Sequence, residues 1–200
     1  MTTPLLLHPG DAGKGREGSP EFLRREGEAR GLSIAIVPAF RDGADAVSSS
    51  AIRSALHEGE IARANGLLGH RYTVSGEIVH GDKRGRLLGY PTANMILDPA
   101  HGLRHGIYAV RMQVDGQVLN GVASFGRRPT FDDGAPRLET FLFDFSGDLY
   151  GRMARVELVA FLRGEAKFAS VEALIEQMDR DSLAAREALA SDIVPSLLPL

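Results

Sequence analysis

The chain contains no cysteine among its 200 residues. This absence excludes disulfides, thiolate zinc sites and a cysteine nucleophile, and it fits the reducing cytoplasm. Long hydrophobic runs are missing too, because the leucines at positions 5–7 are far too few for a signal peptide or a membrane span. A formal net charge of −3 gives no chain-wide attraction to nucleic acid or anionic membranes. We therefore expect a soluble cytoplasmic protein with neither kind of partner.

Two phosphate-binding motifs are also lacking. Residues 10–19 are rich in glycine, but Gly15 follows Lys14 and no glycine stands five residues before Gly13, so the Walker pattern fails. No histidine in the chain begins a His-x-Gly-His sequence. We expect residues 1–19 to be an irregular, solvated segment.

The first third of the chain predicts short helices and one strand. Residues 20–30 fit a helix with proline in its first turn, and residues 32–37 form an apolar run of strand length. A single αβ unit of this kind is too little for a sheet of its own. After a polar connection at residues 41–46, the serines at 48–50 can cap a helix that starts near Ala51. Residues 60–68 fit a linker helix.

From Tyr72 onward the hydrophobic pattern has a period of two, which is typical of strands. Asp115-Gly116 separates two such runs and favours a tight hairpin. Short strands separated by turn signals predict a mainly β fold, a small closed antiparallel barrel of Greek-key type. The strand-like runs are residues 72–79, 107–114, 117–125, 138–145 and 153–161.

A C-terminal helix is predicted after Ser170, which can cap it. Apolar residues then recur at helical spacing, and we expect this stripe to pack on the barrel. The stripe consists of Val171, Leu174, Ile175 and Met178. Beyond Ala190 we expect a frayed tail.

The segment Gly-Tyr-Pro-Thr-Ala-Asn at residues 89–94 carries candidate ligands. Pro91 fixes its own φ and pushes the preceding residue toward extended geometry, so the segment is not helical. In an extended chain Thr92 and Asn94 point to the same side. Their hydroxyl and amide oxygens suit Mg²⁺, which takes few protein ligands and keeps waters and substrate phosphates. The alternative is a proline turn whose side chains satisfy nearby backbone groups.

Glu139 is an acidic residue inside an apolar strand-like run, after Leu138 and before Phe141. An acid in such a strand costs free energy unless it is paired, solvated or functional. The residues alone leave two readings equal: a general base, or a glutamate on the solvent face of the strand.

From Tyr72 onward the chain resembles riboflavin kinases. The matching segments are RYTVSGEIVHGDKRGRLLGYPTAN, GIYAVRM, GVASFGRRPTF, RLETFLFDFSGDLYGR and FLRGEAKFASVEALIEQMDRD, in the family's order. The resemblance implies a six-stranded barrel that transfers the γ-phosphoryl of ATP to the 5′-hydroxyl of riboflavin. It also implies Glu139 as general base, Thr92 and Asn94 as Mg²⁺ ligands, and a C-terminal helix that borders the flavin site.

The same resemblance identifies residues 80–89 as a flap over the nucleotide, where glycines permit close backbone approach and cations can meet phosphate. The alternative is an ordinary basic loop. The nucleotide-binding residues that the resemblance implies are Gly81, Lys83, Gly85, Arg86, Gly89, Pro91, Thr92 and Asn94. A second family loop at residues 126–131 is expected near the site.

Residues 20–69 resemble the end of the FMN adenylyltransferase module of bacterial bifunctional FAD synthetases. VSSSAIR at residues 47–53 is similar to that module's second motif, but the His-x-Gly-His motif is missing. We expect residues 20–69 to be a truncated remnant without adenylyltransferase activity, and residues 70–190 to be the kinase barrel and helix. Two alternatives remain: a non-catalytic flavin-binding module, or a fragment of a bifunctional enzyme.

Two departures from the family pattern concern the flavin site. Many members have His where this chain has Phe141, and Asn where it has Ser124. Either change is expected to alter packing around the flavin. His101 and His105 have helical metal-ligand spacing, but the glycines at 102 and 106 indicate loop residues instead.

Overall fold

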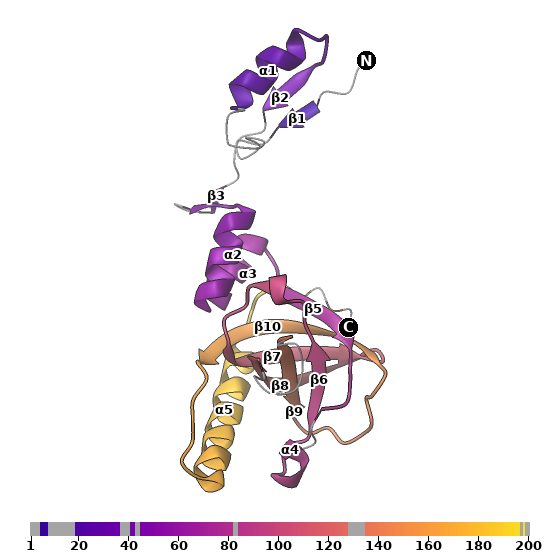
Figure 1. Ribbon diagram of the computed structural model, residues 1–200, viewed down its shortest axis with the longest axis vertical. Helices are drawn as coiled ribbons and strands as arrows, with labels where there is room; N and C mark the ends of the chain where they lie inside the picture. Colours follow the sequence, from indigo (N-terminus) through magenta and orange to yellow (C-terminus); the bar gives the residue numbers. More distant parts are fainter. Residues whose placement is uncertain are drawn as a thin grey trace. The chain divides into compact units, whose positions relative to one another are not determined.

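The computed structural model describes residues 5–7, 19–36, 41–42, 45–81, 84–127, 135–196 and 198 (Figure 1). The chain divides into two compact units, Met1–Val47 and Ser48–Leu200. Among the described residues, no helix is long and apolar enough to cross a membrane, and this includes the 21-residue C-terminal helix.

Among its described residues, the first unit contains the helix α1, Pro20–Glu28, and four short strands. Ser19 caps α1 by accepting a hydrogen bond from the backbone N–H of Phe22 at 3.1 Å, and proline follows in the first turn as predicted. The strand β2, Ile34–Ile36, pairs in parallel with β1, Leu5–Leu7. We expected the strand at residues 32–37 to have no sheet partner and residues 1–19 to be irregular. The pairing of β1 with β2 differs from both expectations. A second difference is the two-residue pair β3, Arg41–Asp42, and β4, Asp45–Ala46, at the expected polar connection.

The second unit opens with α2, Ser49–Glu58, and α3, Ile61–Leu68. The Oγ of Ser48 accepts a hydrogen bond from the backbone N–H of Ala51 at 3.1 Å, so α2 begins slightly earlier than predicted. Both helices end at glycines with positive φ. Their apolar faces are buried in the same core as the barrel strands. The buried residues are Ala55, Leu56, Ile61 and Ala64.

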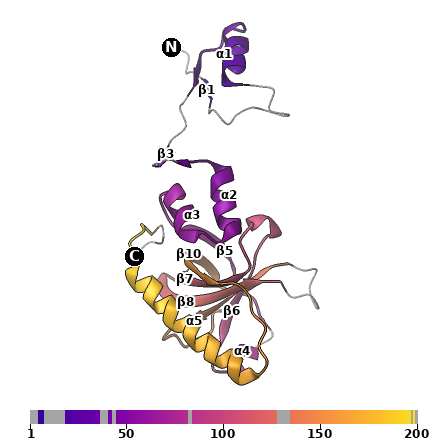
Figure 2. The same ribbon diagram turned by 90° about the vertical axis from the view of Figure 1, so that its left-hand side faces the viewer.

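Six antiparallel strands form one curled sheet, which confirms the predicted mainly β fold (Figures 1 and 2). Its order is β5-β10-β7-β8-β9-β6. The backbone N–H of Val79, two residues after β5, donates to the carbonyl oxygen of Asn94 in β6 at 2.8 Å, which forms an isolated bridge between the two ends of the sheet. The bounds are β5, Tyr72–Glu77; β6, Thr92–Ile96; β7, Gly106–Val114; β8, Gln117–Gly126; β9, Arg137–Leu142; and β10, Met153–Arg163.

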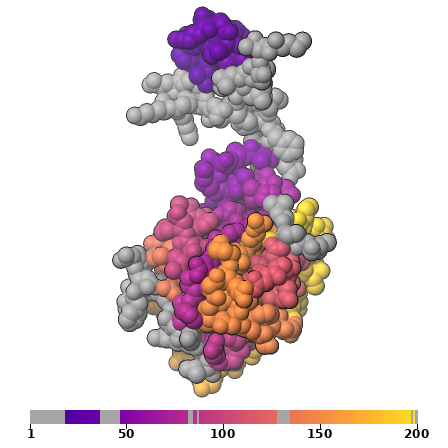
Figure 3. Space-filling view, turned by 90° about the vertical axis from the view of Figure 1, so that its right-hand side faces the viewer, coloured from indigo at the N-terminus to yellow at the C-terminus, as the bar shows by residue number. Residues whose placement is uncertain are grey.

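The predicted hairpin at residues 115–116 is confirmed between β7 and β8. Asp115 has φ 48° and Gly116 has φ 79°. Positive φ at both central residues is the requirement of a type I′ turn, which matches the twist of the flanking strands. Figure 3 shows this hairpin in pink beside the orange surface of β10.

The C-terminal helix α5, Val171–Ser191, covers one face of β7, β8 and β10 (Figure 2). Ser170 caps it as predicted, accepting from the N–H of Ala173 at 3.2 Å. The packing differs from the prediction, because the residues buried against the sheet lie in the second half of the helix, at Ala185 and Leu189. The predicted stripe lies in the first half, where Val171 is 52% exposed. We call the sheet face under α5 the outer face.

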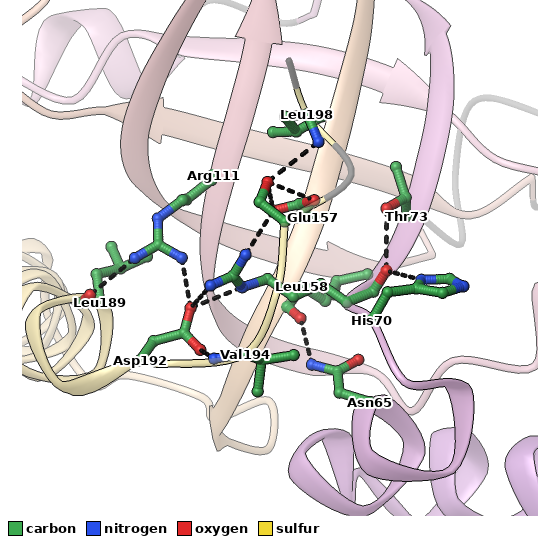
Figure 4. A network of polar contacts seen from close by, with 12 residues as sticks. Asn65, His70, Thr73, Arg111, Glu157, Leu158, Leu189, Asp192, Val194 and Leu198 are labelled. Carbon is green, nitrogen blue, oxygen red and sulfur yellow. Dashed lines mark hydrogen bonds and ion pairs between the residues drawn. The ribbon is translucent and has the colours of Figure 1, made fainter. Parts of the chain in front are cut away.

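The residues after α5 are held by a buried polar network, which differs from the expected frayed tail (Figure 4). Asp192 forms ion pairs with Arg71, at 2.6 Å, and with Arg111. Arg71 also approaches Glu157 at 3.3 Å, and the Oγ of Ser196 donates to that carboxylate at 2.9 Å. Glu157 is fully buried. The network therefore fixes the end of α5 and the following residues on the barrel.

Replacing Asp192 by Asn should destabilise this unit by about 3–5 kcal/mol, because it takes one carboxylate from the buried Arg71 and the carboxylate partner from the partly buried Arg111. Burial raises the pKa of Asp192, but hydrogen bonds from Arg111, Arg71 and the N–H of Val194 outweigh burial and lower it overall. A carboxylate whose pKa is lower in the folded than in the unfolded state stabilises the fold at pH values above its unfolded-state pKa. This stabilisation is lost as the pH falls through its folded-state pKa. Urea unfolding at several pH values should show a smaller acid-dependent loss in D192N. Equal stability of the two proteins would contradict this.

Candidate active site

Thr92 and Asn94 share the outer face of β6, while Ala93 and Met95 point into the core. The Nδ2 of Asn94 donates to the Oγ1 of Thr92 at 3.3 Å, so the two side chains lie on one side as predicted. Across the strand pair, Asn94 is in register with Glu139. Two candidate ligands and the candidate base thus lie on adjacent strands.

The amide oxygen of Asn94 is buried and has no hydrogen-bond partner among the described residues. A Cβ added at Gly81 would lie 2.5 Å from this oxygen, so only glycine lets the backbone approach so closely. A buried acceptor without a partner costs free energy. A neutral hard oxygen in a tight cradle is suited to a hard divalent cation such as Mg²⁺.

No group of three or more His, Asp or Glu side chains in the described part of the chain could hold a metal. A divalent cation at Asn94 and Thr92 would therefore depend on a few neutral protein oxygens together with water and substrate phosphates, which is the usual mode for Mg²⁺.

A pocket of about 410 Å³ lies on the outer face, and we call it the outer-face pocket. Glu139, Thr92 and Ser124 line it from the sheet, and Leu174 and Met178 line it from α5. The remaining lining residues are Gly85, Leu88, Tyr90, Ile107, Val122, Ala123, Phe141, Arg163, Glu165, Ala166, Phe168 and Asp181. The pocket combines apolar walls with a few polar groups, as sites for small molecules do.

A second pocket of about 270 Å³ opens at the mouth of the barrel, and we call it the barrel-mouth pocket. It is lined by Ile78, Arg86, Pro91, Thr92, Ala93, Thr140, Leu142 and residues 145–150. A small cavity of about 20 Å³ adjoins Gly81, Arg86, Pro91, Thr92, Asn94 and Tyr150. Thr92 lines all three spaces and is therefore their common junction.

The residues predicted for the flap are distributed around this junction. Its middle is a single helical turn, α4, Arg84–Leu87, where a loop was expected. Arg86 and Pro91 line the barrel-mouth pocket and the small cavity, whereas Gly85 lines the outer-face pocket. A Cβ at Gly85 would meet the carbonyl oxygen of Tyr90 at 2.3 Å.

Some predicted site residues lie away from these spaces or outside the described part. Gly89 has φ 83° in the turn after α4 and does not line the three spaces. Lys83 lies outside the described residues. In the second predicted loop, Arg127 is exposed, and residues 128–131 lie outside the described residues.

Sequence reasoning missed Tyr90, whose hydroxyl donates to Asp179 of α5. Burial, followed by the hydrogen bond to Asp179, raises the pKa of Tyr90 to about 12. Its ring lies 4.7 Å from that of Phe141, measured between centroids. Tyr90 thus connects the flap to α5 at the outer-face pocket.

Arg163 and Asp181 were also missed. The guanidinium of Arg163 donates two hydrogen bonds to the carboxylate of Asp181, at 2.8 and 2.6 Å, and Gln177 donates to it at 2.8 Å. Asp181 follows Leu174 and Met178 on one stripe of α5 at spacings of seven and three residues. An acid within an apolar stripe was the signal that could have revealed this polar end of the pocket.

The two departures from the family pattern, Ser124 and Phe141, both line the outer-face pocket, and Ser124 is in register with Glu139. The histidines at 101 and 105 do not form a pair. The Nδ1 of His101 shares a hydrogen bond with the hydroxyl of Tyr72 at 2.9 Å, and His105 approaches Glu165 at 3.9 Å.

Residues 68–189 match the family model described as Flavokinase: Riboflavin kinase. The chain is 42% identical to a bifunctional riboflavin kinase/FMN adenylyltransferase of Escherichia coli strain K12 over 176 residues, 88% of this chain and 56% of that protein. It is 40% identical to the protein of the same description from Listeria monocytogenes, over 84% of this chain and 54% of that protein. The chain therefore spans about half the length of these curated relatives.

Among solved structures, a crystal structure described as a macrolide-efflux protein from Streptococcus pneumoniae has a TM-score of 0.73 and 34% identity. The likeness covers 86% of this chain and 56% of that one. The polypeptide path of most of this chain is thus shared with a protein of known structure.

Proposed function

Because this chain belongs to the riboflavin kinase family, we propose that it transfers the γ-phosphoryl of ATP to the 5′-hydroxyl of riboflavin. The observation that carries the proposal is the position of Thr92, which lines both the pocket that contains Glu139 and the cavity beside Asn94. Phosphoryl transfer depends mainly on positioning and on neutralising charge, so two adjoining pockets with a shared residue suit it.

Riboflavin occupies the outer-face pocket in this proposal. The apolar side chains of Ile107, Val122 and Met178 offer surfaces for a flat ring system. The ribityl chain runs toward Thr92, and its terminal hydroxyl lies within reach of Glu139. The partly buried Glu139 carboxylate accepts the hydroxyl proton as the oxygen bonds to the γ-phosphorus and the bond to ADP breaks.

ATP occupies the barrel-mouth pocket, with its phosphates toward the small cavity. Arg86 lines both spaces and can neutralise phosphate charge. A bound Mg²⁺ would supply charge neutralisation on the transferring phosphate, and the oxygens of Thr92 and Asn94 would hold it. The close approach of Gly81 keeps the amide oxygen of Asn94 shielded from bulk water.

The test is a product assay. The purified chain, given riboflavin, ATP and Mg²⁺, should form FMN and ADP, with chromatography separating FMN from FAD. We expect no FAD, because the His-x-Gly-His motif is missing from this chain. Riboflavin binding without ATP consumption would instead favour a non-catalytic flavin-binding module. Appearance of FAD would contradict the expected loss of adenylyltransferase activity, which the two bifunctional relatives carry in their description.

A further inference from the structure

The hydroxyl of Thr140 is buried and lacks a hydrogen-bond partner in the described part of the chain. Thr140 is 1% exposed, and its Oγ1, like the amide oxygen of Asn94, has no hydrogen-bond partner among the described residues. Buried polar side-chain atoms are nearly always hydrogen-bonded, so an orphaned hydroxyl indicates a missing ligand or water. Thr140 lies outside the set of residues predicted for the site.

The strand geometry directs Thr140 into the barrel. It follows Glu139 on β9, and alternate residues of a strand face opposite sides. Its partners in register are Ala93 and Ala123, both small and buried in the core. The methyl group of Thr140 lies toward Gly121, where an added Cβ would meet it at 3.2 Å. The residues that surround this side chain are therefore small.

Thr140 is also one of the residues that line the barrel-mouth pocket. The neighbouring wall is apolar, formed by Ile78, Ala93, Leu142 and Phe145. Arg86, which also lines this pocket, can meet a phosphate, whereas the flat faces of an uncharged base suit the apolar residues. The phosphate-binding candidates Thr92 and Asn94 instead project from the outer side of the sheet.

We propose that Thr140 is a specificity-determining residue that hydrogen-bonds the polar edge of the nucleotide's base in the barrel-mouth pocket. A hydroxyl both donates and accepts, so it can pair with the amino group or a ring nitrogen of adenine. This inference rests on the proposed use of ATP. It divides the nucleotide between two faces of one sheet, with the base inside the barrel and the phosphates at the junction.

The test compares Thr140→Val, which keeps the shape but removes the hydroxyl, with Thr140→Ser, which keeps the hydroxyl. In T140V the Kd and KM for ATP should rise about 5- to 10-fold, the effect of one lost hydrogen bond. The KM for riboflavin and the Kd for inorganic tripolyphosphate, determined in parallel with the values for ATP, should stay unchanged. The melting temperature of the ligand-free protein should be equal or higher, because the variant buries no unpaired hydroxyl. T140S should bind ATP like the parent.

Ser75→Ala is the control, since it removes an exposed hydroxyl from β5 outside the three spaces and should leave ATP binding unchanged. An unchanged Kd for ATP in T140V would overturn the proposal. So would equal weakening of ATP and tripolyphosphate, or a lower melting temperature with riboflavin binding also lost, which would indicate a structural role. Calorimetry of ATP binding needs no turnover, so a parent protein that binds ATP but forms no FMN would refute the proposed reaction alone. A parent that does not bind ATP would refute both.

Discussion

Replacement of Glu139 by Gln should lower the rate of FMN formation at saturating substrates about 100- to 10,000-fold, the usual contribution of a positioned general base. Glutamine keeps the size and shape of the side chain but cannot take the proton of the ribityl hydroxyl. The measurement is the steady-state turnover of FMN at saturating riboflavin, ATP and Mg²⁺. Because the substitution is nearly isosteric, the Kd for riboflavin should change by less than about 3-fold, a small effect beside that of the lost base.

Glu165→Gln provides the matched control for this experiment. Glu165 lines the same outer-face pocket, but it is 56% exposed and is not in register with Asn94. Its replacement should therefore leave turnover near that of the parent protein. If E139Q and E165Q are equally active, the base has been assigned to the wrong residue. If E139Q fails to bind riboflavin, the carboxylate instead serves to hold the substrate.

Replacement of Asn94 by Ala should lower kcat/KM for ATP at least about 100-fold, comparable to removing a positioned group that stabilises transition-state charge. The amide oxygen is unpartnered within the described fold and lies close to Gly81, so its loss should affect mainly the proposed binding of metal and phosphate. The Mg²⁺ concentration for half-maximal activity should rise. The check is a titration of activity against Mg²⁺ at fixed ATP, with riboflavin affinity measured beside it.

Asn120→Ala is a suitable control for Asn94, because it changes an exposed asparagine on β8 outside the pockets described. A folded N94A protein with unchanged dependence on Mg²⁺ and ATP would rule out Asn94 as a ligand. The melting temperature of N94A should stay close to the parent value, because the amide oxygen of Asn94 forms no hydrogen bond within the described fold of the parent. The only described side-chain hydrogen bonds that the variant loses are those from Nδ2 to Thr92.

Much of the barrel was predictable because the signals are local. Alternation with a period of two located five of the six strands of the sheet, β6 being the exception, and Asp115-Gly116 specified the hairpin between β7 and β8. The same alternation placed Thr92 and Asn94 on one side. Their register with Glu139 was not predictable, because it depends on how two strands separated by more than forty residues pair.

The walls of the outer-face pocket were beyond local reasoning for the same reason. Arg163 and Asp181 form a polar pair only when α5 folds back over the sheet. The ordered C-terminal segment likewise requires Arg71 and Arg111, which come from distant parts of the chain. A pattern read along the sequence predicts which side chains share one face of a helix or strand. It does not predict these ion pairs, because they form between elements that are distant in the sequence.

The bridge between Val79 and Asn94 couples closure of the barrel to the proposed binding of the nucleotide. Where β5 and β6 meet, the described structure has only this one paired position outside the named strands. One of its two residues carries the amide that we assign to Mg-ATP. A nucleotide bound beside Asn94 would stabilise the bridged pair that closes the barrel. By mass action, nucleotide binding and barrel closure would then each favour the other.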